Sequence, residues 1–97
     1  MAEGKSPDPE IAMAEVIMYC TRFCPYCVMA TRLLEQKKQQ IEKIYVDNKP
    51  ELRSHMTRIS NGRSTVPQIF IDGKHVGGYS DIAMLDHRDE LDSLLGI

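Results

Sequence analysis

Hydrophobic and polar positions along this 97-residue chain predict an alternation of strands and helices. The first apolar run, residues 15–20, has strand character, and the apolar positions after residue 27 recur with the spacing of one helix face. A second run, residues 41–47, is rich in β-branched and aromatic residues, and residues 49–60 carry another helical stripe. Asn48 is a candidate N-cap for this second helix. The first half therefore predicts the order strand, helix, strand, helix.

The second half predicts a hairpin and a terminal helical region. Residues 68–71 and 74–76 are short strands separated by an Asp-Gly pair, which is typical of tight hairpin turns. From residue 80 to residue 95 an apolar stripe has helical spacing, but the polar run 87–90 interrupts it, so one helix and two short helices are both open. The full order implies an α/β fold with a four-stranded mixed sheet and helices on both faces.

Length and composition indicate a single domain. Ninety-seven residues, 42% of them hydrophobic, suffice for one modest core. We assign the domain to residues 13–97. Residues 1–12, rich in Gly, Pro and polar positions, are expected to be a flexible N-terminal extension or a cloning remnant.

Charge and hydropathy exclude several partner classes. The net charge of −2 and the scattered basic residues give no reason to expect nucleic-acid binding. No apolar run approaches the roughly 20 residues that cross a bilayer, so no membrane partner is expected. The N-terminus lacks the pattern of a secretory signal. We therefore expect a cytoplasmic monomer.

The candidate chemistry lies in Cys24-Pro25-Tyr26-Cys27, where the first strand pattern gives way to a helix. Proline is favoured at the first helical position, which makes Cys24 the N-cap. A sulfur at that position faces free N–H groups and the positive end of the helix dipole, so we expect Cys24 to have thiolate character near neutral pH. Cys27 lies nearly one turn further on and is expected to be the more buried, resolving thiol. The pair predicts a redox-active dithiol.

Half of a zinc site is the main alternative for a Cys-x-x-Cys pair. A zinc site needs two more Cys or His ligands at a suitable spacing. The remaining candidates form no second closely spaced pair: Cys20, His55, His75 and His87. The Pro-Tyr filling favours redox chemistry, and we expect no bound metal. We interpret Cys20 as a small strand residue, with regulatory oxidation left open, and the histidines as surface polar groups.

A second candidate segment, Thr65-Val66-Pro67, introduces the hairpin. A trans bond before Pro67 is the commoner case, because only about 5–6% of X-Pro bonds in folded proteins are cis. A cis bond would turn the backbone N–H and C=O of Val66 outward, toward a bound peptide.

The third segment, Gly77-Gly78-Tyr79-Ser80-Asp81, ends the hairpin and opens the last helical region. Its glycines allow close backbone approach or positive φ, and Ser80 or Asp81 can cap the helix. The free N–H groups of a helix start suit a carboxylate ligand. Taken alone, an ordinary loop explains this segment, but its combination with the thiol motif favours a binding site.

With these three motifs in this order, residues 13–97 resemble the glutaredoxins, and in particular the dithiol members with Cys-Pro-Tyr-Cys. The resemblance implies a thioredoxin-like fold, a cis Pro67 and glutathione as the electron donor. It also implies that one set of residues lines a glutathione groove: Tyr26, Thr65, Val66, Pro67, Gly78, Ser80 and Asp81. Val66 would pair with the cysteinyl backbone of glutathione, and the Ser80 amide and Asp81 would hold the γ-glutamyl end.

The chain departs from the family pattern at two places. Thr21 stands where many members have a lysine that assists the thiolate and the glycyl carboxylate. Arg53 is a candidate glutathione contact that would supply this charge, and Arg22 is the alternative. The turn at residues 37–40 lacks the usual glycine.

The resemblance implies that Cys24 alone reduces protein–glutathione mixed disulfides, and that Cys24 and Cys27 together reduce disulfides of client proteins. Two other functions are considered. A glutathione-ligated iron–sulfur cluster scaffold is disfavoured by Pro25 and Cys27. A thioredoxin-like electron carrier is disfavoured by the segment at residues 77–81.

Overall fold

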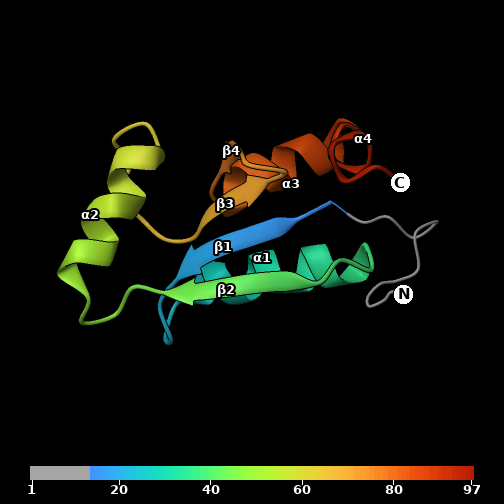
Figure 1. The fold of residues 1–97 in the computed structure, drawn as a ribbon. Coiled ribbons are helices and arrows are strands. Elements are labelled where there is room, and N and C mark those ends of the chain that lie inside the picture. Colours follow the sequence, from blue (N-terminus) through green and yellow to red (C-terminus); the bar gives the residue numbers. More distant parts are fainter. Residues whose placement is uncertain (1–13) are drawn as a thin grey trace, which may run out of the picture.

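The computed structural model describes residues 14–97, so the assignments for residues 1–12 and for Met13 lie outside the described residues. Figure 1 shows the elements in chain order: β1 (Val16–Cys20), α1 (Pro25–Gln36), β2 (Ile41–Tyr45), α2 (Pro50–Ile59), β3 (Gln68–Ile71), β4 (Lys74–Gly77), α3 (Tyr79–His87) and α4 (Leu91–Leu95). This order confirms the predicted sequence of strands and helices and divides the terminal helical region into two helices.

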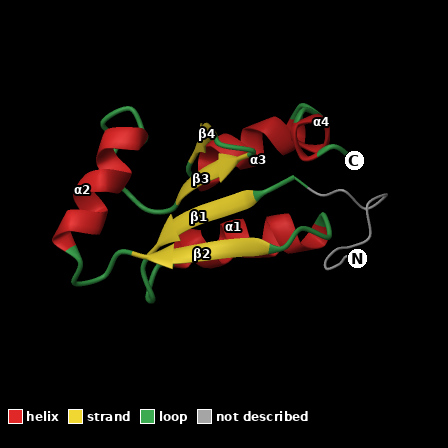
Figure 2. Ribbon diagram, in the orientation of Figure 1, coloured by secondary structure: helices red, strands yellow, loops and turns green. Residues whose placement is uncertain are grey.

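The four strands form one mixed sheet in the order β2-β1-β3-β4 (Figure 2). β1 and β2 are parallel, with Val16 opposite Ile41, as a right-handed crossover through α1 requires. β3 is antiparallel to β1 and to β4. Asp72 and Gly73 both have positive φ, 52° and 80°, in the predicted tight turn between β3 and β4. β1 is therefore an inner strand of the sheet, and the thiol motif at residues 24–27 follows its C-terminal end.

Helices cover both faces of the sheet, because successive strand residues point to opposite sides. On one face, α1, α3 and α4 pack on β1 and β3 around fully buried residues that include Met18, Leu34, Ile69, Ile82 and Leu91. On the other face, α2 packs over a smaller cluster: Tyr19, Val46, Met56 and Phe70. Burying such a side chain contributes about 1.5–3 kcal/mol, so each face holds its helices mainly by apolar contact.

Some local details differ from the sequence prediction. Asn48 is not the N-cap of α2, because it takes a left-handed turn conformation with φ of 55°, and Lys49 precedes the helix without a side-chain cap. The terminal region breaks after α3, where Asp89 has φ of 60°. Lys38 also has positive φ, 65°, in the turn that lacks a glycine.

The end of α1 is tied to the last two helices by one side chain. Lys37 Nζ lies 2.7 Å from Asp86 Oδ1 on α3 and 2.8 Å from Asp92 Oδ1 on α4. These carboxylates raise the pKa of Lys37 above the usual range of lysine. Within residues 14–97, every helix is too short or too polar to cross a membrane.

Candidate active site

Cys24 is the N-cap of α1, and Pro25 occupies the start of the helix, as predicted. The Cys24 sulfur accepts a hydrogen bond from the N–H of Cys27 at 3.2 Å, and its thiol donates to the C=O of Val66 at 3.7 Å. The exposed fraction is 9% for Cys24 and 5% for Cys27, so Cys27 is the more buried thiol, as expected. Thr31 Oγ1 donates to the C=O of Cys27 at 2.8 Å. The first turn of α1 therefore holds both sulfurs against the loop that precedes β3.

The pKa of Cys24 is shifted upward in this reduced arrangement, opposite to the direction expected from the helix start. Burial and the Cys27 thiol raise the pKa of Cys24, and they outweigh the backbone N–H groups of Cys27 and Tyr26, which lower it. The N–H groups at the helix start thus lower the pKa of Cys24, as predicted, but their effect is smaller than the opposing effects, and the net shift is upward. Thr21, in place of a lysine, brings no positive charge to offset the burial.

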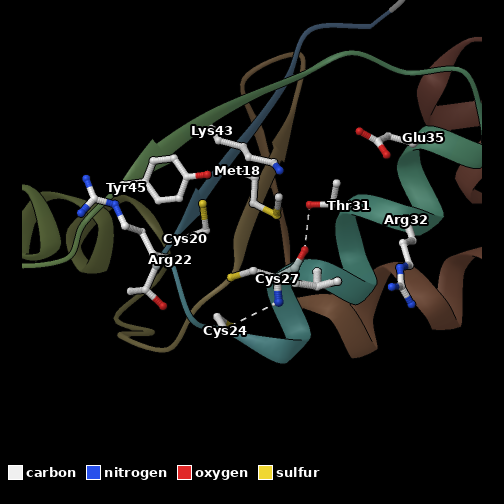
Figure 3. A pocket seen from close by; sticks show the side chains of 12 residues that line it. Met18, Cys20, Arg22, Cys24, Cys27, Thr31, Arg32, Glu35, Lys43 and Tyr45 are labelled. Atoms are coloured by element: carbon white, nitrogen blue, oxygen red, sulfur yellow. Dashed lines mark hydrogen bonds between the residues drawn. The ribbon is translucent and has the colours of Figure 1, made fainter.

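Cys20, at the end of β1, interacts with Cys27. The Cys20 thiol and burial raise the pKa of Cys27, and the Cys27 thiol in turn lowers the pKa of Cys20. Cys20 and Cys27 both line a cavity of about 260 Å³ between β1, α1 and β2. Figure 3 shows their side chains among those that line it. All three cysteines are free thiols, and Cys20 is buried together with Cys24 and Cys27.

The second and third motifs meet beside Cys24. The Val66–Pro67 bond is cis, in agreement with the resemblance. Gly78 approaches Pro67 so closely that a Cβ on Gly78 would lie 3.1 Å from the Pro67 carbonyl oxygen. Thr65 is exposed, Val66 is half-buried and Pro67 is buried. The structure therefore brings together the segments that the sequence pattern marked separately.

Tyr26 connects the thiol motif to the start of α3. Its side chain is 60% exposed, and its ring stacks on that of Tyr79 with centroids 6.4 Å apart and an interplanar angle of 29°. Ser80 is exposed in the first turn of α3. It does not cap the helix, because Gly78 is the N-cap.

Asp81 caps the start of α3 with its carboxylate. Its Oδ2 accepts from the N–H of Gly78 at 2.8 Å and from Arg63 Nη1 at 2.9 Å. Burial opposes ionisation, but the Gly78 N–H and the Arg63 guanidinium outweigh it and lower the pKa of Asp81. Gly77 has φ of 121°, and a Cβ there would overlap the Asp81 carboxylate, so this position requires glycine. Asp81 is therefore held as an anion at the end of the proposed groove.

The two arginines proposed to replace the usual lysine lie at different places. Arg22 also lines the cavity, and Figure 3 shows its side chain extending toward Tyr45 and away from Cys24. Its guanidinium carbon is 5.9 Å from the centroid of the Tyr45 ring. Arg53 on α2 donates to the C=O of Ser64 at 3.0 Å, next to the loop at Thr65. The guanidinium of Arg22 thus lies beside Tyr45, and that of Arg53 lies beside the loop at Thr65.

Sequence reasoning missed the polar support of the site. Arg63 pairs with Asp81 across 18 residues. His75, interpreted from sequence as a surface polar group, is half-buried and lies 2.7 Å, at Nε2, from Gln68 Oε1. Gln68 is fully buried beneath Thr65. The only available signals were a polar residue in a strand pattern and an arginine just before the loop.

The sequence profile of the glutaredoxin family matches residues 16–76. The chain belongs to the glutaredoxin family. It is similar to a glutaredoxin of Pseudomonas aeruginosa, with 45% identity over 83 residues that cover 86% of this chain and 98% of the relative. Membership of the glutaredoxin family identifies the chain, in general terms, as a glutathione-dependent thiol oxidoreductase.

Solved structures show the thioredoxin-like fold of this glutaredoxin. The solution structure of a glutaredoxin from Brucella melitensis is 44% identical and superposes with a TM-score of 0.76, covering 86% of this chain and 89% of that chain. The crystal structure of a buckwheat glutaredoxin–glutathione complex has a TM-score of 0.79 at 23% identity, covering 86% of this chain and 77% of that chain. In residues 14–97 of this glutaredoxin, no group of three or more His, Cys, Asp and Glu side chains is arranged to hold a metal ion.

Proposed function

We propose that this chain reduces protein–glutathione mixed disulfides through Cys24 and protein disulfides through Cys24 and Cys27. One observation carries the proposal: the Cys24 sulfur lies between the N–H of Cys27 at 3.2 Å and the C=O of Val66 at 3.7 Å. The reactive thiol is therefore next to both its resolving partner and the loop that would bind a peptide backbone. Cytoplasmic localisation and a monomeric state stay predictions.

The monothiol reaction needs only Cys24. Its thiolate attacks the glutathione sulfur of the mixed disulfide, and a bond forms between these two sulfurs. The bond from glutathione to the client breaks, and the client leaves as a thiolate that takes up a proton. A second glutathione thiolate then attacks the glutathione sulfur on Cys24, releasing glutathione disulfide and the Cys24 thiolate. The N–H of Cys27 stabilises negative charge on the Cys24 sulfur whenever it develops.

The dithiol reaction adds Cys27. After Cys24 attacks a client disulfide, Cys27 loses its proton and attacks the Cys24 sulfur of the mixed intermediate. A bond forms between Cys24 and Cys27, the bond to the client breaks, and the client thiolate takes up a proton. Glutathione then reduces the enzyme disulfide in two exchanges.

Backbone groups and charges beside Cys24 support a glutathione groove. We assign it to Tyr26, Thr65, Val66, Pro67, Gly78, Ser80 and Asp81. The ionised carboxylate of Asp81 suits the ammonium of the γ-glutamyl end, and the free N–H groups at the start of α3, including that of Ser80, suit its carboxylate. Arg53, bonded to Ser64 next to Thr65, is proposed to attract the glycyl carboxylate. The guanidinium of Arg22 lies over the Tyr45 ring instead.

The test is glutathione-dependent reduction of a small glutathione mixed disulfide, coupled to glutathione reductase and NADPH. We expect turnover by the wild type and by Cys27→Ser, and none by Cys24→Ser. The matched variants have the same serine in the same helix turn, so they separate the two sulfurs. Activity of Cys24→Ser above background would contradict the assignment of the nucleophile.

A protein-disulfide substrate completes the test. Here Cys24→Ser is expected to be inactive because it lacks the attacking thiol, and Cys27→Ser because its mixed intermediate with the client is not resolved.

If the wild type is inactive with glutathione but is reduced by a thioredoxin reductase, the carrier function replaces this proposal. A brown protein with visible absorbance after anaerobic purification would instead favour the cluster scaffold.

A further inference from the structure

Behind the proposed groove, polar side chains form a continuous chain of hydrogen bonds from the end of α2 to Thr65. Asn61 Nδ2 lies 3.0 Å from His75 Nδ1, and His75 Nε2 lies 2.7 Å from Gln68 Oε1. Gln68 Nε2 then donates to the C=O of Thr65 at 3.0 Å and to Thr65 Oγ1 at 3.2 Å. This series of hydrogen bonds thus runs from His75 on β4 to Gln68 on β3 and ends at Thr65, in the loop that carries Val66.

The donor and the acceptor of each hydrogen bond in this series are fixed. The C=O of Thr65 can only accept, so Gln68 presents its Nε2 to the loop and its Oε1 to His75. An amide oxygen also only accepts, so Nε2 of His75 must carry the hydrogen. In the neutral ring, Nδ1 then accepts from the amide of Asn61. The orientation of Gln68 therefore depends on one tautomer of His75.

The surroundings suit a neutral ring. Burial and the positive charge of Arg63 lower the pKa of His75, and they outweigh the opposing charge of Asp81. The Phe70 ring lies against His75, with centroids 5.1 Å apart. Gln68 is fully buried, and His75 is the group that lies within hydrogen-bond distance of its Oε1. Loss of this donor would leave Gln68 free to turn and to release Thr65.

We propose that His75 is a positioning residue for glutathione binding, which acts through Gln68 to hold Thr65 and the backbone of Val66 in place. The proposal rests on the proposed function, because it concerns the affinity of the same groove. His75 lies behind the loop before β3 and is not part of it. It would therefore control how tightly glutathione binds without touching the reacting sulfur.

Three substitutions of His75 separate a positioning role from a general structural one. His75→Phe removes the donor while keeping a ring, and His75→Asn retains a polar group only near the place of Nδ1. His75→Gln places an amide N–H near the place of Nε2 and is the conservative variant. His87→Gln, on the exposed end of α3, is the control. Steady-state kinetics with varied glutathione are measured for each.

We expect His75→Phe and His75→Asn to raise the KM for glutathione roughly five- to tenfold, as the loss of one hydrogen bond in a buried chain would do. Their kcat should stay within about twofold of the wild type, because the environment of Cys24 is unchanged. His75→Gln should recover most of the affinity, and the control should match the wild type. Equal KM values for His75→Gln and His75→Asn, or a loss confined to kcat, would overturn the proposal.

Nitrogen NMR of the wild-type imidazole provides a test that needs no activity and no variant. We expect His75 to be neutral at pH 7, with its hydrogen on Nε2 and protected from exchange. A hydrogen on Nδ1 would overturn the positioning proposal even if every variant fails to fold. Absence of wild-type turnover with glutathione would instead overturn the proposed function and leave the tautomer result standing.

Discussion

The Cys24 sulfur lies 3.2 Å from the backbone nitrogen of Cys27 and accepts its hydrogen bond at the first turn of α1. This contact favours the thiolate, but burial and the Cys27 thiol raise the pKa of Cys24 by more than the helix start lowers it. The reactivity of Cys24 therefore depends on how much further positive charge reaches the sulfur.

A lysine at position 21 should supply that charge. We expect Thr21→Lys to lower the pKa of Cys24 and to make its alkylation by iodoacetamide several-fold faster at pH 7, because more of the thiol is then ionised. The measurement is the pH dependence of Cys24 modification, followed by mass spectrometry. Thr21→Gln has similar length without charge, so equal rates for the Lys and Gln variants would rule out this electrostatic explanation.

The ion pair between Asp81 and Arg63 predicts a loss of stability in acid. The folded state lowers the pKa of Asp81, so its carboxylate stabilises the fold above the ordinary aspartate pKa of about 3.9. That contribution is lost as the pH falls through the lower, folded-state pKa. Because both side chains are partly exposed, Asp81→Asn should lower the free energy of unfolding at pH 7 by up to about 1 kcal/mol.

Urea unfolding of the wild type and Asp81→Asn at a series of pH values checks this expectation. The two stabilities should converge as the pH falls below about 4. Arg63→Gln is the matched variant, because it removes the other partner and should show the same convergence. A constant difference between the wild type and Asp81→Asn across this range would contradict the assigned ion pair.

Gly77 should tolerate no side chain. With φ of 121°, an alanine would be strained and its Cβ would overlap the Asp81 carboxylate. We expect Gly77→Ala to lower the free energy of unfolding by about 1–3 kcal/mol and to raise the KM for glutathione. Gly62→Ala is the control, because Gly62 has φ of 85° but open space around its Cβ position. Equal KM values for the two variants would mean that Asp81 is not displaced.

The Lys37 contacts with Asp86 and Asp92 should stabilise the packing of α1 against α3 and α4. We expect Lys37→Gln to lower the midpoint of thermal unfolding at low ionic strength, with a difference from the wild type that shrinks as salt is added. Lys38→Gln, on the next and exposed residue, should have less effect. Differential scanning calorimetry at two salt concentrations distinguishes the pair, and a salt-independent loss would point to packing instead of charge.

The parts of the fold that could be predicted from the sequence are those that are determined by residues adjacent in the sequence. Pro25 starts a helix through its own backbone geometry, and the Asp-Gly pair forms a hairpin within two residues. The pKa direction of Cys24 was wrong because burial arises only when distant elements cover the sulfur.

The support of the groove was beyond sequence reasoning for the same reason. Arg63 and Asp81 are 18 residues apart, and His75 meets Gln68 only because β3 and β4 pair in one particular register. In the sequence, a histidine in a polar strand pattern has the same appearance whether it faces solvent or a buried amide. The turn at Asn48 was also misjudged, because its side chain fits both an N-cap and a left-handed turn.

The sheet places β1 directly beside β3, and two separate stretches of the chain thereby meet at the candidate site. Both reactive sulfurs come from the stretch that contains β1 and α1, whereas most of the proposed groove comes from the loop before β3 and the start of α3 (Figure 1). The thiols and most of the proposed glutathione groove thus belong to separate segments of the sequence, which meet only when the chain is folded. Most substitutions that would alter the choice of thiol partner therefore fall after residue 60, in a part of the chain that contains neither Cys24 nor Cys27.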